Sequence, residues 1–527
     1  MSLVNKELYE NADCQRKAVQ INWEISECLR QAGESVDIAF PVIPYLLYKV
    51  SLYNNPFDIT LQAILNGEIE VENDVRYLVK ACLNDKLWDS LLQLVNKYST
   101  EDFALAVVNP VTDNESKGTM PTPNSILKLV HKLLNVKAGE NVADVCCGSG
   151  TYIVSAALEE ANAIYHGYEI NVESRAAAMM KAELLDSDIE ISLCDAFTVA
   201  ESEKMPKYDK IFANYPFGLK LKNLGAGTVY LEKLAEKYPS LSKATSSDWV
   251  FNALICDMLA DCGKAIGIMT NGSTWNSIDI PMRKYFVERK MVECVIALPG
   301  KLFTSTSIPT TLIILSHNND SVRMIDATKH CQRGRRQNEF SDENINAIID
   351  ALTTDHEYSR TISIEELRKN EYNLNLSRYA ANELSFHNGV PFESIIKSIS
   401  RGAPCTASQL DEMVSDSVTN MQYLMLANIQ NGIIDDKLPY LSYIDQKYDK
   451  YCLKNNTLIL SKNGFPYKVA VASVQDNQRI LANGNLYIIE LDEEKADPYY
   501  IKAFFESEQG HAVLYYCRCC NAQYWCR

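Results

Sequence analysis

Between residues 118 and 385, short apolar runs alternate with stretches in which apolar residues recur every three or four positions. Short runs bounded by polar or turn residues are typical of buried strands, and the wider spacing is typical of amphipathic helices. The predicted strands are 141–145, 164–169, 189–193, 208–213, 264–269, 291–298 and 310–315. The predicted helices include 124–134, 152–160, 174–185, 248–260 and 281–289. This alternation predicts an α/β fold with a mostly parallel sheet covered on both faces.

The two ends of the chain have different patterns. Up to about residue 110 the spacing is helical, as in 18–32 and 75–98. From about 390, strand-like runs dominate, at 421–426, 457–460, 469–473 and 486–491. Asn431-Gly432 and Asn463-Gly464 mark turns between them. We therefore expect an N-terminal helical domain over 1–115, an α/β domain over 116–387 and an α+β domain over 388–527.

Composition narrows the class of protein. No apolar run reaches the ~18 residues that span a bilayer, and the N-terminus lacks the layout of a secretory signal, so we expect a cytoplasmic protein without a membrane partner. The 16 cysteines are mostly scattered, which favours neither a disulfide framework nor a metal site. The net charge of −17 means that any nucleic-acid groove is small or shares its positive charge with a partner. Arg333-Gly334-Arg335-Arg336, with Lys329 nearby, is a candidate basic patch, and a solvated loop is the alternative.

A glycine loop follows the strand 141–145. It reads Asp144-Val145-Cys146-Cys147-Gly148-Ser149-Gly150-Thr151 and leads into a helix. Glycine lets the backbone turn tightly and lets a ligand approach the main chain, and the helix N-terminus offers free N–H groups. The loop lacks the phosphate cradle of nucleotide triphosphatases and the third glycine of G-x-G-x-x-G, so it fits neither a triphosphatase nor an NAD site well.

Acidic residues follow the next two strands. Glu169 lies 19 residues after Gly150, where a carboxylate can accept hydrogen bonds from the ribose hydroxyls of a nucleoside cofactor. Asp195 follows the third strand and suits an adenine amino group, while Phe197 can pack on the adenine ring. Open α/β sheets bind ligands at the carboxyl ends of their strands. Acids at three consecutive strand ends therefore favour a nucleoside-cofactor site over solvated positions.

The fourth strand ends in Asn214-Tyr215-Pro216-Phe217, about 66 residues after Gly148. Adenine N6 is a poor nucleophile because its lone pair is delocalised into the ring. An amide oxygen and a backbone carbonyl that accept hydrogen bonds from the amino group can draw that lone pair out of conjugation. Proline fixes the backbone, and an aromatic ring can stack on a base extruded from the duplex. Alone, the four residues read equally well as a turn; after the fourth strand they indicate adenine N6 methylation.

These motifs resemble those of the N6-adenine DNA methyltransferases, specifically the modification subunit of type I restriction–modification systems. The family's upstream Thr-Pro segment is similar to Gly118-Thr119-Met120-Pro121-Thr122-Pro123-Asn124. Its later segments are similar to Asp248-Trp249-Val250-Phe251, Gly263-Lys264-Ala265-Ile266, Asn271-Gly272, Ala297-Leu298-Pro299, Leu302-Phe303, Ile308-Pro309-Thr310 and Tyr372-Asn373-Leu374-Asn375. The resemblance implies a Rossmann-like, S-adenosylmethionine-dependent, adenine-specific enzyme that methylates double-stranded DNA.

The resemblance also implies roles and partners. The catalytic residues are Asn214, Tyr215, Pro216 and Phe217. The cofactor-binding residues are Met120, Thr122, Pro123, Asp144, Gly148, Ser149, Gly150, Glu169, Asp195 and Phe197, and no metal is implied. A specificity subunit, a restriction subunit and a second copy of the chain are candidate partners. Two departures stand out: Tyr215 replaces the first proline of the usual N-P-P-F, which leaves the carbonyl orientation less fixed, and Asp144-Val145 replaces Asp-Pro.

The C-terminal region looks like a target-recognition domain of a type I specificity subunit. The matching stretches are 399–402, 425–435, 456–464 and 499–507. The residues after about Ala512 do not continue that pattern, so we expect a truncated or altered C-terminus. Two other functions stay open: methylation of RNA or of a protein glutamine, and a silenced protein that only binds DNA or assembles a complex.

Overall fold

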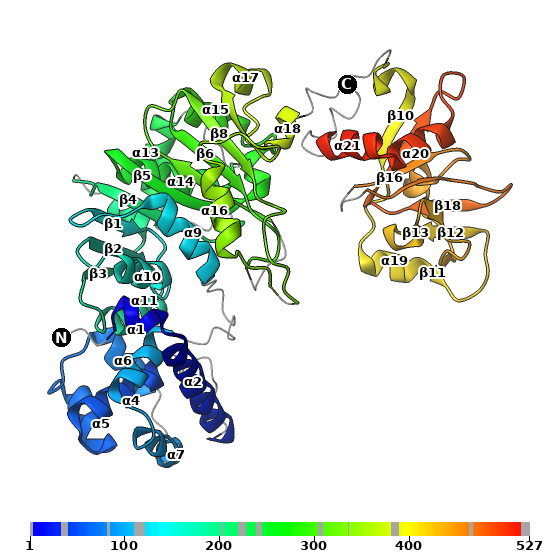
Figure 1. Cartoon of the computed structure of the whole chain (residues 1–527). Helices are drawn as coiled ribbons and strands as arrows, with labels where there is room; N and C mark the ends of the chain where they lie inside the picture. Colours follow the sequence, from blue (N-terminus) through cyan, green and yellow to red (C-terminus); the bar gives the residue numbers. More distant parts are fainter. Residues whose placement is uncertain are drawn as a thin grey trace. The chain divides into compact units, whose positions relative to one another are not determined.

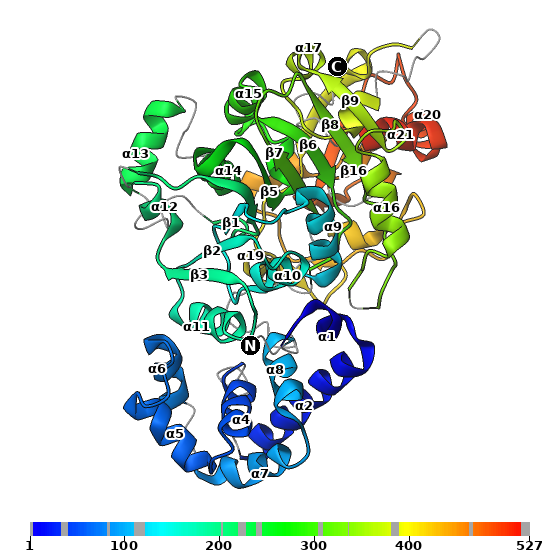
Figure 2. The same ribbon diagram turned by 60° about the vertical axis from the view of Figure 1, so that its left-hand side comes forward.

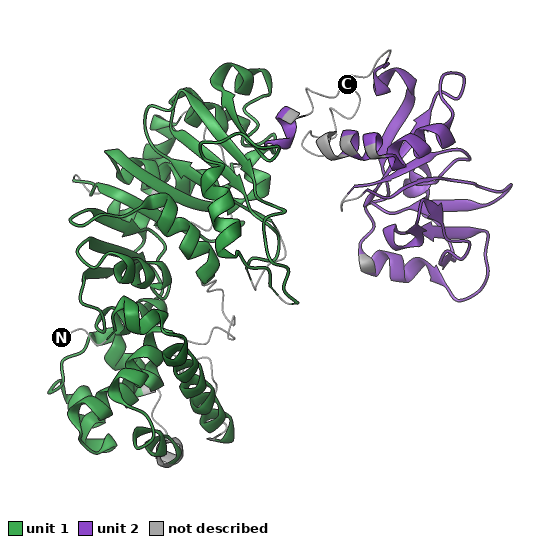
Figure 3. Ribbon diagram, viewed as in Figure 1, with its two compact units in different colours: residues 1–374 green, residues 375–527 purple. Residues whose placement is uncertain are grey.

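The computed structural model of the chain describes residues 4–32, 41–81, 85–109, 122–201, 204–219, 228–238, 245–303, 309–335, 337–380, 389–462 and 467–517. It forms two compact units, residues 1–374 and 375–527 (Figure 3). The helical and α/β regions share the first unit, and the division into three domains stays a prediction. In the described ranges, no helix is long and apolar enough to cross a membrane.

The N-terminal region is helical, as the apolar spacing predicts. The described helices are α1 (Lys6–Glu10), α2 (Ala12–Ala32), α4 (Val42–Tyr53), α5 (Phe57–Asn66), α6 (Asn73–Ala81), α7 (Asp85–Val95) and α8 (Thr100–Val108). Helix α8 starts at a capping box made by Ser99 and Asp102 and is buried from Phe103 onward. It packs between α2 and α4 and forms the centre of this helical layer.

A nine-stranded mixed sheet forms the core of the first unit, with the order β3-β2-β1-β4-β5-β7-β6-β8-β9. The strands are β1 (Asn141–Asp144), β2 (Ile164–Glu169), β3 (Asp188–Leu193), β4 (Tyr208–Ala213), β5 (Leu259–Thr270), β6 (Val292–Ala297), β7 (Thr310–Leu315), β8 (Ser321–Asp326) and β9 (Ser359–Ser363). The first five strands are parallel to one another, β7 runs antiparallel between β5 and β6, β8 is parallel to β6, and β9 is antiparallel to β8. The predicted α/β fold class is confirmed.

Helices cover both faces of this sheet (Figures 1 and 2). On one face α9 (Asn124–Leu134) packs beside α10 (Thr151–Glu159) and α16 (Asp342–Asp350), and α11 (Val172–Ala182) packs beside α10 over β2 and β3. The right-handed crossover from β4 to β5 places α14 (Ser247–Met258) on the opposite face. The remaining described helices of the unit are α12 (Ala196–Val199), α13 (Thr228–Lys237), α15 (Ile280–Glu288) and α17 (Ile364–Lys369).

Polar contacts join the N-terminal helices to α11. The guanidinium of Arg175 donates to Asp74 at 2.7 Å and to the carbonyl of Ile191 at 2.8 Å. At the other end of α11, Glu183 accepts hydrogen bonds from Tyr45 and from Lys49. The helical region is therefore fixed to the helix that links β2 to β3.

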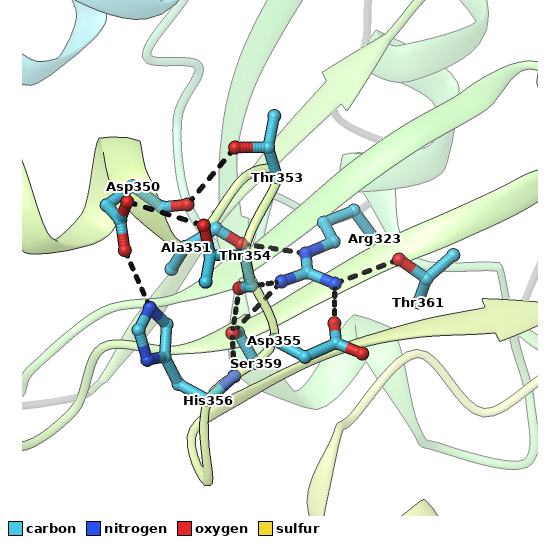
Figure 4. A network of polar contacts seen from close by, with 9 residues as sticks. All are labelled: Arg323, Asp350, Ala351, Thr353, Thr354, Asp355, His356, Ser359 and Thr361. Atoms are coloured by element: carbon cyan, nitrogen blue, oxygen red, sulfur yellow. Dashed lines mark hydrogen bonds and ion pairs between the residues drawn. The ribbon is translucent and has the colours of Figure 1, made fainter.

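The edge of the sheet beyond β6 is held by Arg323, a buried residue of β8 (Figure 4). Its Nε donates to the carbonyl of Ala351 at 2.7 Å, and its terminal nitrogens donate to Asp355, to Ser359 Oγ at 3.1 Å and to Thr361 Oγ1 at 2.9 Å. These bonds fix the segment that joins α16 to β9.

The second unit is an α+β domain, in agreement with the predicted change of pattern. One sheet contains β10 (Ile396–Arg401), β19 (Leu486–Leu491), β16 (Leu458–Ser461) and β17 (Val469–Val471), and another contains β11 (Val414–Ser415), β15 (Tyr440–Leu441), β12 (Met421–Leu424) and β18 (Arg479–Ala482). A hairpin joins β13 (Ile429–Gln430) to β14 (Ile433–Ile434). Its turn residues Asn431 and Gly432 have φ values of 49° and 75°, as the predicted turn requires. Helices α18 (Ser377–Ala380), α19 (Ala407–Met413), α20 (Pro498–Glu506) and α21 (Glu508–Cys517) complete the described part, and Asn463-Gly464 lies outside it.

Candidate functional site

Four polar residues lie at the carboxyl edge of the parallel strands. Asp144 ends β1, Glu169 ends β2, Asp195 follows β3 by two residues, and Asn214 follows β4 directly. The chain reverses its direction of travel across the sheet between the adjacent strands β1 and β4, which is the position at which open α/β sheets bind ligands. The topology therefore brings the predicted cofactor and catalytic residues to one edge.

The glycine loop has the backbone that only glycine adopts freely. Gly148 and Gly150 have φ values of 54° and 76°, and Gly150 is the N-cap of α10. A Cβ at Gly150 would lie 3.0 Å from the Cβ of Ala178 in α11, whereas nothing lies within 4 Å of a Cβ at Gly148. The loop thus packs tightly against the protein at Gly150 and has open space beside Gly148.

Two side chains fix this loop. Glu169 accepts a hydrogen bond from the Gly148 N–H at 2.8 Å and another from the Asn171 N–H at 2.7 Å. Lys181, buried in α11, donates to the Ser149 carbonyl at 2.8 Å and lies 3.3 Å from Ser149 Oγ. Burial lowers the pKa of Lys181 to about 8. Sequence reasoning missed Lys181, because nothing in the spacing of α11 links it to the loop.

Asp144 lies at the bottom of the site with 2% of its surface exposed. It accepts a hydrogen bond from the Cys146 N–H at 3.0 Å. Burial, opposed by that bond and supported by the charge of Glu169, raises the pKa of Asp144 to about 8. The hydroxyl of Tyr152 is also buried, and within the described residues it has no hydrogen-bond partner. A buried acid with a strongly raised pKa at the carboxyl end of a strand is typical of a functional site.

Asp195 and Phe197 lie at the start of α12, and their assignment to an adenine site stays a prediction. Asp195 is the N-cap of α12 and accepts from the Phe197 N–H at 2.9 Å. The ring of Phe197 is buried between Tyr230 and Phe251, with centroid distances of 5.3 and 5.1 Å. Ile170, directly after Glu169, is an exposed apolar residue.

The predicted catalytic tetrapeptide, residues 214–217, lies in the loop after β4. Asn214 Nδ2 donates to Thr122 Oγ1 at 3.1 Å, which joins the tetrapeptide to the Thr-Pro segment, where Pro123 is the N-cap of α9. Pro216 is exposed, and Phe217 packs edge-on against Phe303 at a centroid distance of 5.8 Å. Met120 lies outside the described residues.

Tyr215 is fully buried, although the resemblance gives its position to a proline. Its ring stacks on Phe251 of α14 at 4.9 Å with an interplanar angle of 6°, and its hydroxyl donates to Asn252 Oδ1 at 3.2 Å. A Cβ at Gly267 would lie 3.2 Å from the Tyr215 ring, so the glycine of β5 makes room for it. Burial raises the pKa of Tyr215 well above its usual range, and the hydroxyl stays a donor.

The end of β5 is fixed by the same helix. Asp248 of α14 accepts from the Thr270 N–H at 2.9 Å and from Ser273 Oγ at 2.7 Å. Tyr215 and this turn are therefore both held by α14. In the sequence, residues 248–251 are recognised only as a segment similar to the family, and their supporting role is not predicted. Position 215 is therefore held by the packing and the hydrogen bond of a buried tyrosine side chain, whereas a proline would fix it through its backbone ring.

Comparisons with known proteins agree with this geometry. Residues 105–387, more than half of the chain, match the family described as N-6 DNA Methylase. The type I restriction enzyme MjaVII methylase subunit of Methanocaldococcus jannaschii is 26% identical over 339 residues, which cover 56% of this chain and 57% of that protein. The MjaVIII methylase subunit of the same organism is 27% identical over 433 residues, which cover 71% of this chain and 70% of that protein.

One solved structure with the same fold is the methyltransferase subunit of a type I restriction–modification system from Streptococcus thermophilus. Its TM-score is 0.52 at 19% identity, and the match covers 68% of this chain and 98% of that one. This chain spans less than two thirds of the MjaVII subunit. The family match over more than half of the sequence, together with the shared fold and the arrangement of the four strand ends, shows that the chain belongs to the N-6 DNA methylase family.

Proposed function

We propose that this protein transfers a methyl group from S-adenosylmethionine to N6 of an adenine in double-stranded DNA, as the modification subunit of a type I restriction–modification system. The observation that supports this most directly is the placement of Asn214 beside Thr122, one strand from Asp144 at the carboxyl edge of the sheet. The names of its relatives point to the same activity.

The donors and acceptors of the site fit S-adenosylmethionine. Its amino group, ribose hydroxyls and adenine amino group are all donors, and Asp144, Glu169 and Asp195 are acceptors in that order along the edge. A carboxylate has about four acceptor sites, so Glu169 can hold both backbone N–H groups and the ribose. Phe197 lines the adenine end, and Ile170 adds apolar surface. The loop Gly148-Ser149-Gly150 and the segment Thr122-Pro123 enclose the methionine end, and the part predicted for Met120 rests on the resemblance alone. Bound there, the cofactor supplies an electrophilic methyl carbon on a positively charged sulfur.

The tetrapeptide prepares the adenine. Asn214 Oδ1 and the carbonyl of Tyr215 accept the two N6 hydrogens, which localises the nitrogen lone pair without a charged base. Pro216 stiffens the loop, and Phe217, supported by Phe303, stacks on the extruded base. Positioning of N6 in line with the methyl group then contributes most of the rate.

The second unit and the partners extend this proposal. We infer that residues 388–527 read DNA bases as a target-recognition domain, because the stretches noted above are similar to such domains. A specificity subunit and a restriction subunit complete the system, which acts in the cytoplasm.

Methyl transfer from labelled S-adenosylmethionine to DNA tests the proposal, with the full chain and its partner subunits present. Asn214→Ala is expected to lose more than about 100-fold in rate, because one acceptor of the reacting amino group is gone. Asn162→Ala, an exposed change before β2, is the control and is expected to keep full activity. Equal incorporation by Asn214→Ala and the wild type would refute the assigned chemistry.

A further inference from the structure

A cationic hairpin, residues 329–339, leaves the same sheet edge as the candidate site. Its sequence has four lysine and arginine residues and a single carboxylate, Glu339, in a chain with a net charge of −17. Lys329, Arg333 and Arg335 are exposed. Within the described residues none of these three forms an ion pair, whereas Arg323 and Arg368 both do. Their charge is therefore available to a partner.

The hairpin has a defined backbone. Gln332 and Glu339 pair through two hydrogen bonds, 2.8 Å from the Gln332 N–H and 3.0 Å from the Glu339 N–H. A Cβ at Gly334 would overlap the carbonyl oxygen of Gln337, so the turn folds back more closely than any other residue allows. The far end of the following helix α16 is fixed by the Arg323 network (Figure 4). Arg333 and Arg335 are thus exposed side chains between the paired residues Gln332 and Glu339.

The hairpin is tied to the catalytic loop. Strand β8, which precedes it, is parallel to β6, and both run in the same direction as β4 because β7 reverses between β5 and β6. Asn338 N donates to the Lys301 carbonyl at 2.7 Å, and Gln337 Nε2 donates to the Leu302 carbonyl at 2.6 Å. The next residue, Phe303, carries the ring against which Phe217 packs.

We propose that the cationic hairpin binds phosphates of the DNA strand beside the adenine that enters the site. An acidic protein repels DNA unless local cations replace the counterions of the phosphates. Phosphate contacts also fix the register of a duplex on a protein without reading its sequence. Since the hairpin is bonded to the segment that supports Phe217, a strand held there is held in register with the catalytic loop. This inference rests on the proposed function.

Salt-dependent binding of a fluorescent duplex to the full chain tests the inference. The double variant Arg333→Gln/Arg335→Gln is expected to lower the slope of log Kd against log salt by about 2, since each phosphate contact contributes about 0.9. Its affinity near 50 mM salt is expected to fall at least about tenfold. The affinity for S-adenosylmethionine is expected to stay unchanged, because the hydrogen bonds of the hairpin go to residues 300–302 and not to the glycine loop.

A matched control removes the same charge from the opposite sheet edge. Arg289→Gln/Lys290→Gln lies before the amino end of β6 and is expected to keep the wild-type slope. Gly334→Ala keeps every charge but breaks the turn, and is expected to weaken binding severalfold. If the hairpin double variant matches the control, or if Gly334→Ala binds like the wild type, the inference is overturned while the proposed function stands. A wild-type chain that binds no duplex even with its partner subunits present overturns both.

Discussion

Tyr215 allows a quantitative test of how the catalytic loop is held. Tyr215→Ala removes a fully buried ring, and truncation of a buried aromatic residue to alanine lowers the free energy of unfolding by about 3–5 kcal/mol. Asn252 Oδ1 then loses its donor at 3.2 Å, at a further cost of about 1–3 kcal/mol for an unpaired buried acceptor. Tyr215→Phe keeps the stack on Phe251 and loses the hydroxyl alone, so it leaves the same unpaired Asn252 Oδ1 and is expected to lower the free energy of unfolding by about 1–3 kcal/mol. The two variants separate the ring from the hydrogen bond.

The rate of methyl transfer is expected to depend on the aromatic ring of residue 215 more than on its hydroxyl. A displacement of about 1 Å at the reacting centre can cost roughly 100-fold, so Tyr215→Ala is expected to slow single-turnover methyl transfer by about that factor. Tyr215→Phe is expected to stay within severalfold of the wild type. Tyr215→Pro, although it restores the family's residue, vacates the space between Phe251 and Gly267 and is expected to slow the reaction as well.

Two measurements are needed, because any of these variants loses stability. Single-turnover rates are taken below the unfolding transition of each variant, and amide hydrogen exchange is followed in the peptide that contains 214–218. Tyr165→Ala is the matched control: Tyr165 is equally buried in β2, and its hydroxyl donates to the Ala156 carbonyl at 2.9 Å. It is expected to lose similar stability with no change in rate or in exchange at the loop. Wild-type exchange and rate in Tyr215→Ala would refute this account of position 215.

Three further predictions concern the cofactor edge. Gly150→Ala is expected to lower the free energy of unfolding by about 2–4 kcal/mol, because left-handed backbone strain of about 1–2 kcal/mol adds to crowding against Ala178. Gly139→Ala, at a φ of 79° with open space around the new Cβ, is the control and loses only the strain energy. Equal losses of unfolding free energy for the two variants in denaturant melts would contradict the crowding at Gly150. Because burial lowers the pKa of Lys181 to about 8, the unfolded chain binds more protons at Lys181 than the folded chain between that pH and about 10.5, and this residue contributes stability that rises with pH across the window. Buried cysteines and tyrosines with raised pKa values act in the opposite sense in both proteins, so the test is the difference in unfolding free energy between the wild type and Lys181→Met, which is expected to shift in favour of the wild type as the pH rises. The raised pKa of Asp144, about 8, predicts that the affinity for cationic S-adenosylmethionine increases from about pH 6 to 8, measured by equilibrium dialysis; a slope that persists in Asp144→Asn would assign it elsewhere.

The sequence predicts strands well where an apolar run is bounded by polar residues. The predicted ranges 164–169, 208–213 and 310–315 coincide with β2, β4 and β7. It does not predict that β7 is antiparallel, because a fully buried run has no direction of its own and takes it from β5 and β6. Strand β8 escapes prediction since Arg323 interrupts its apolar pattern, and only the Ala351–Thr361 segment shows why a buried arginine is tolerated there.

The site follows the same rule. Strand ends are local features, so Asp144, Glu169, Asp195 and Asn214 can be assigned to one edge from the order of the elements. The supports of that edge are contacts between distant segments. Lys181 reaches Ser149 across 32 residues, and Asn252 reaches Tyr215 across 37. No spacing in the sequence encodes such pairs. From the sequence, Tyr215 is therefore expected to leave the carbonyl orientation less fixed than proline would, whereas the structure shows its side chain buried and bonded to α14.

Helix α11 has a consequence for where this protein can be divided. One of its surfaces supports the glycine loop through Ala178 and Lys181, and the other carries the ion pair of Arg175 with Asp74 and the contacts of Glu183 with Tyr45 and Lys49. The domain boundary predicted near residue 115 therefore does not separate two independently held parts, because the N-terminal helices are bonded to α11. Recombination that exchanges the N-terminal helices between relatives must exchange the outer surface of α11 with them, and a partner that displaces those helices also displaces the helix that supports the glycine loop.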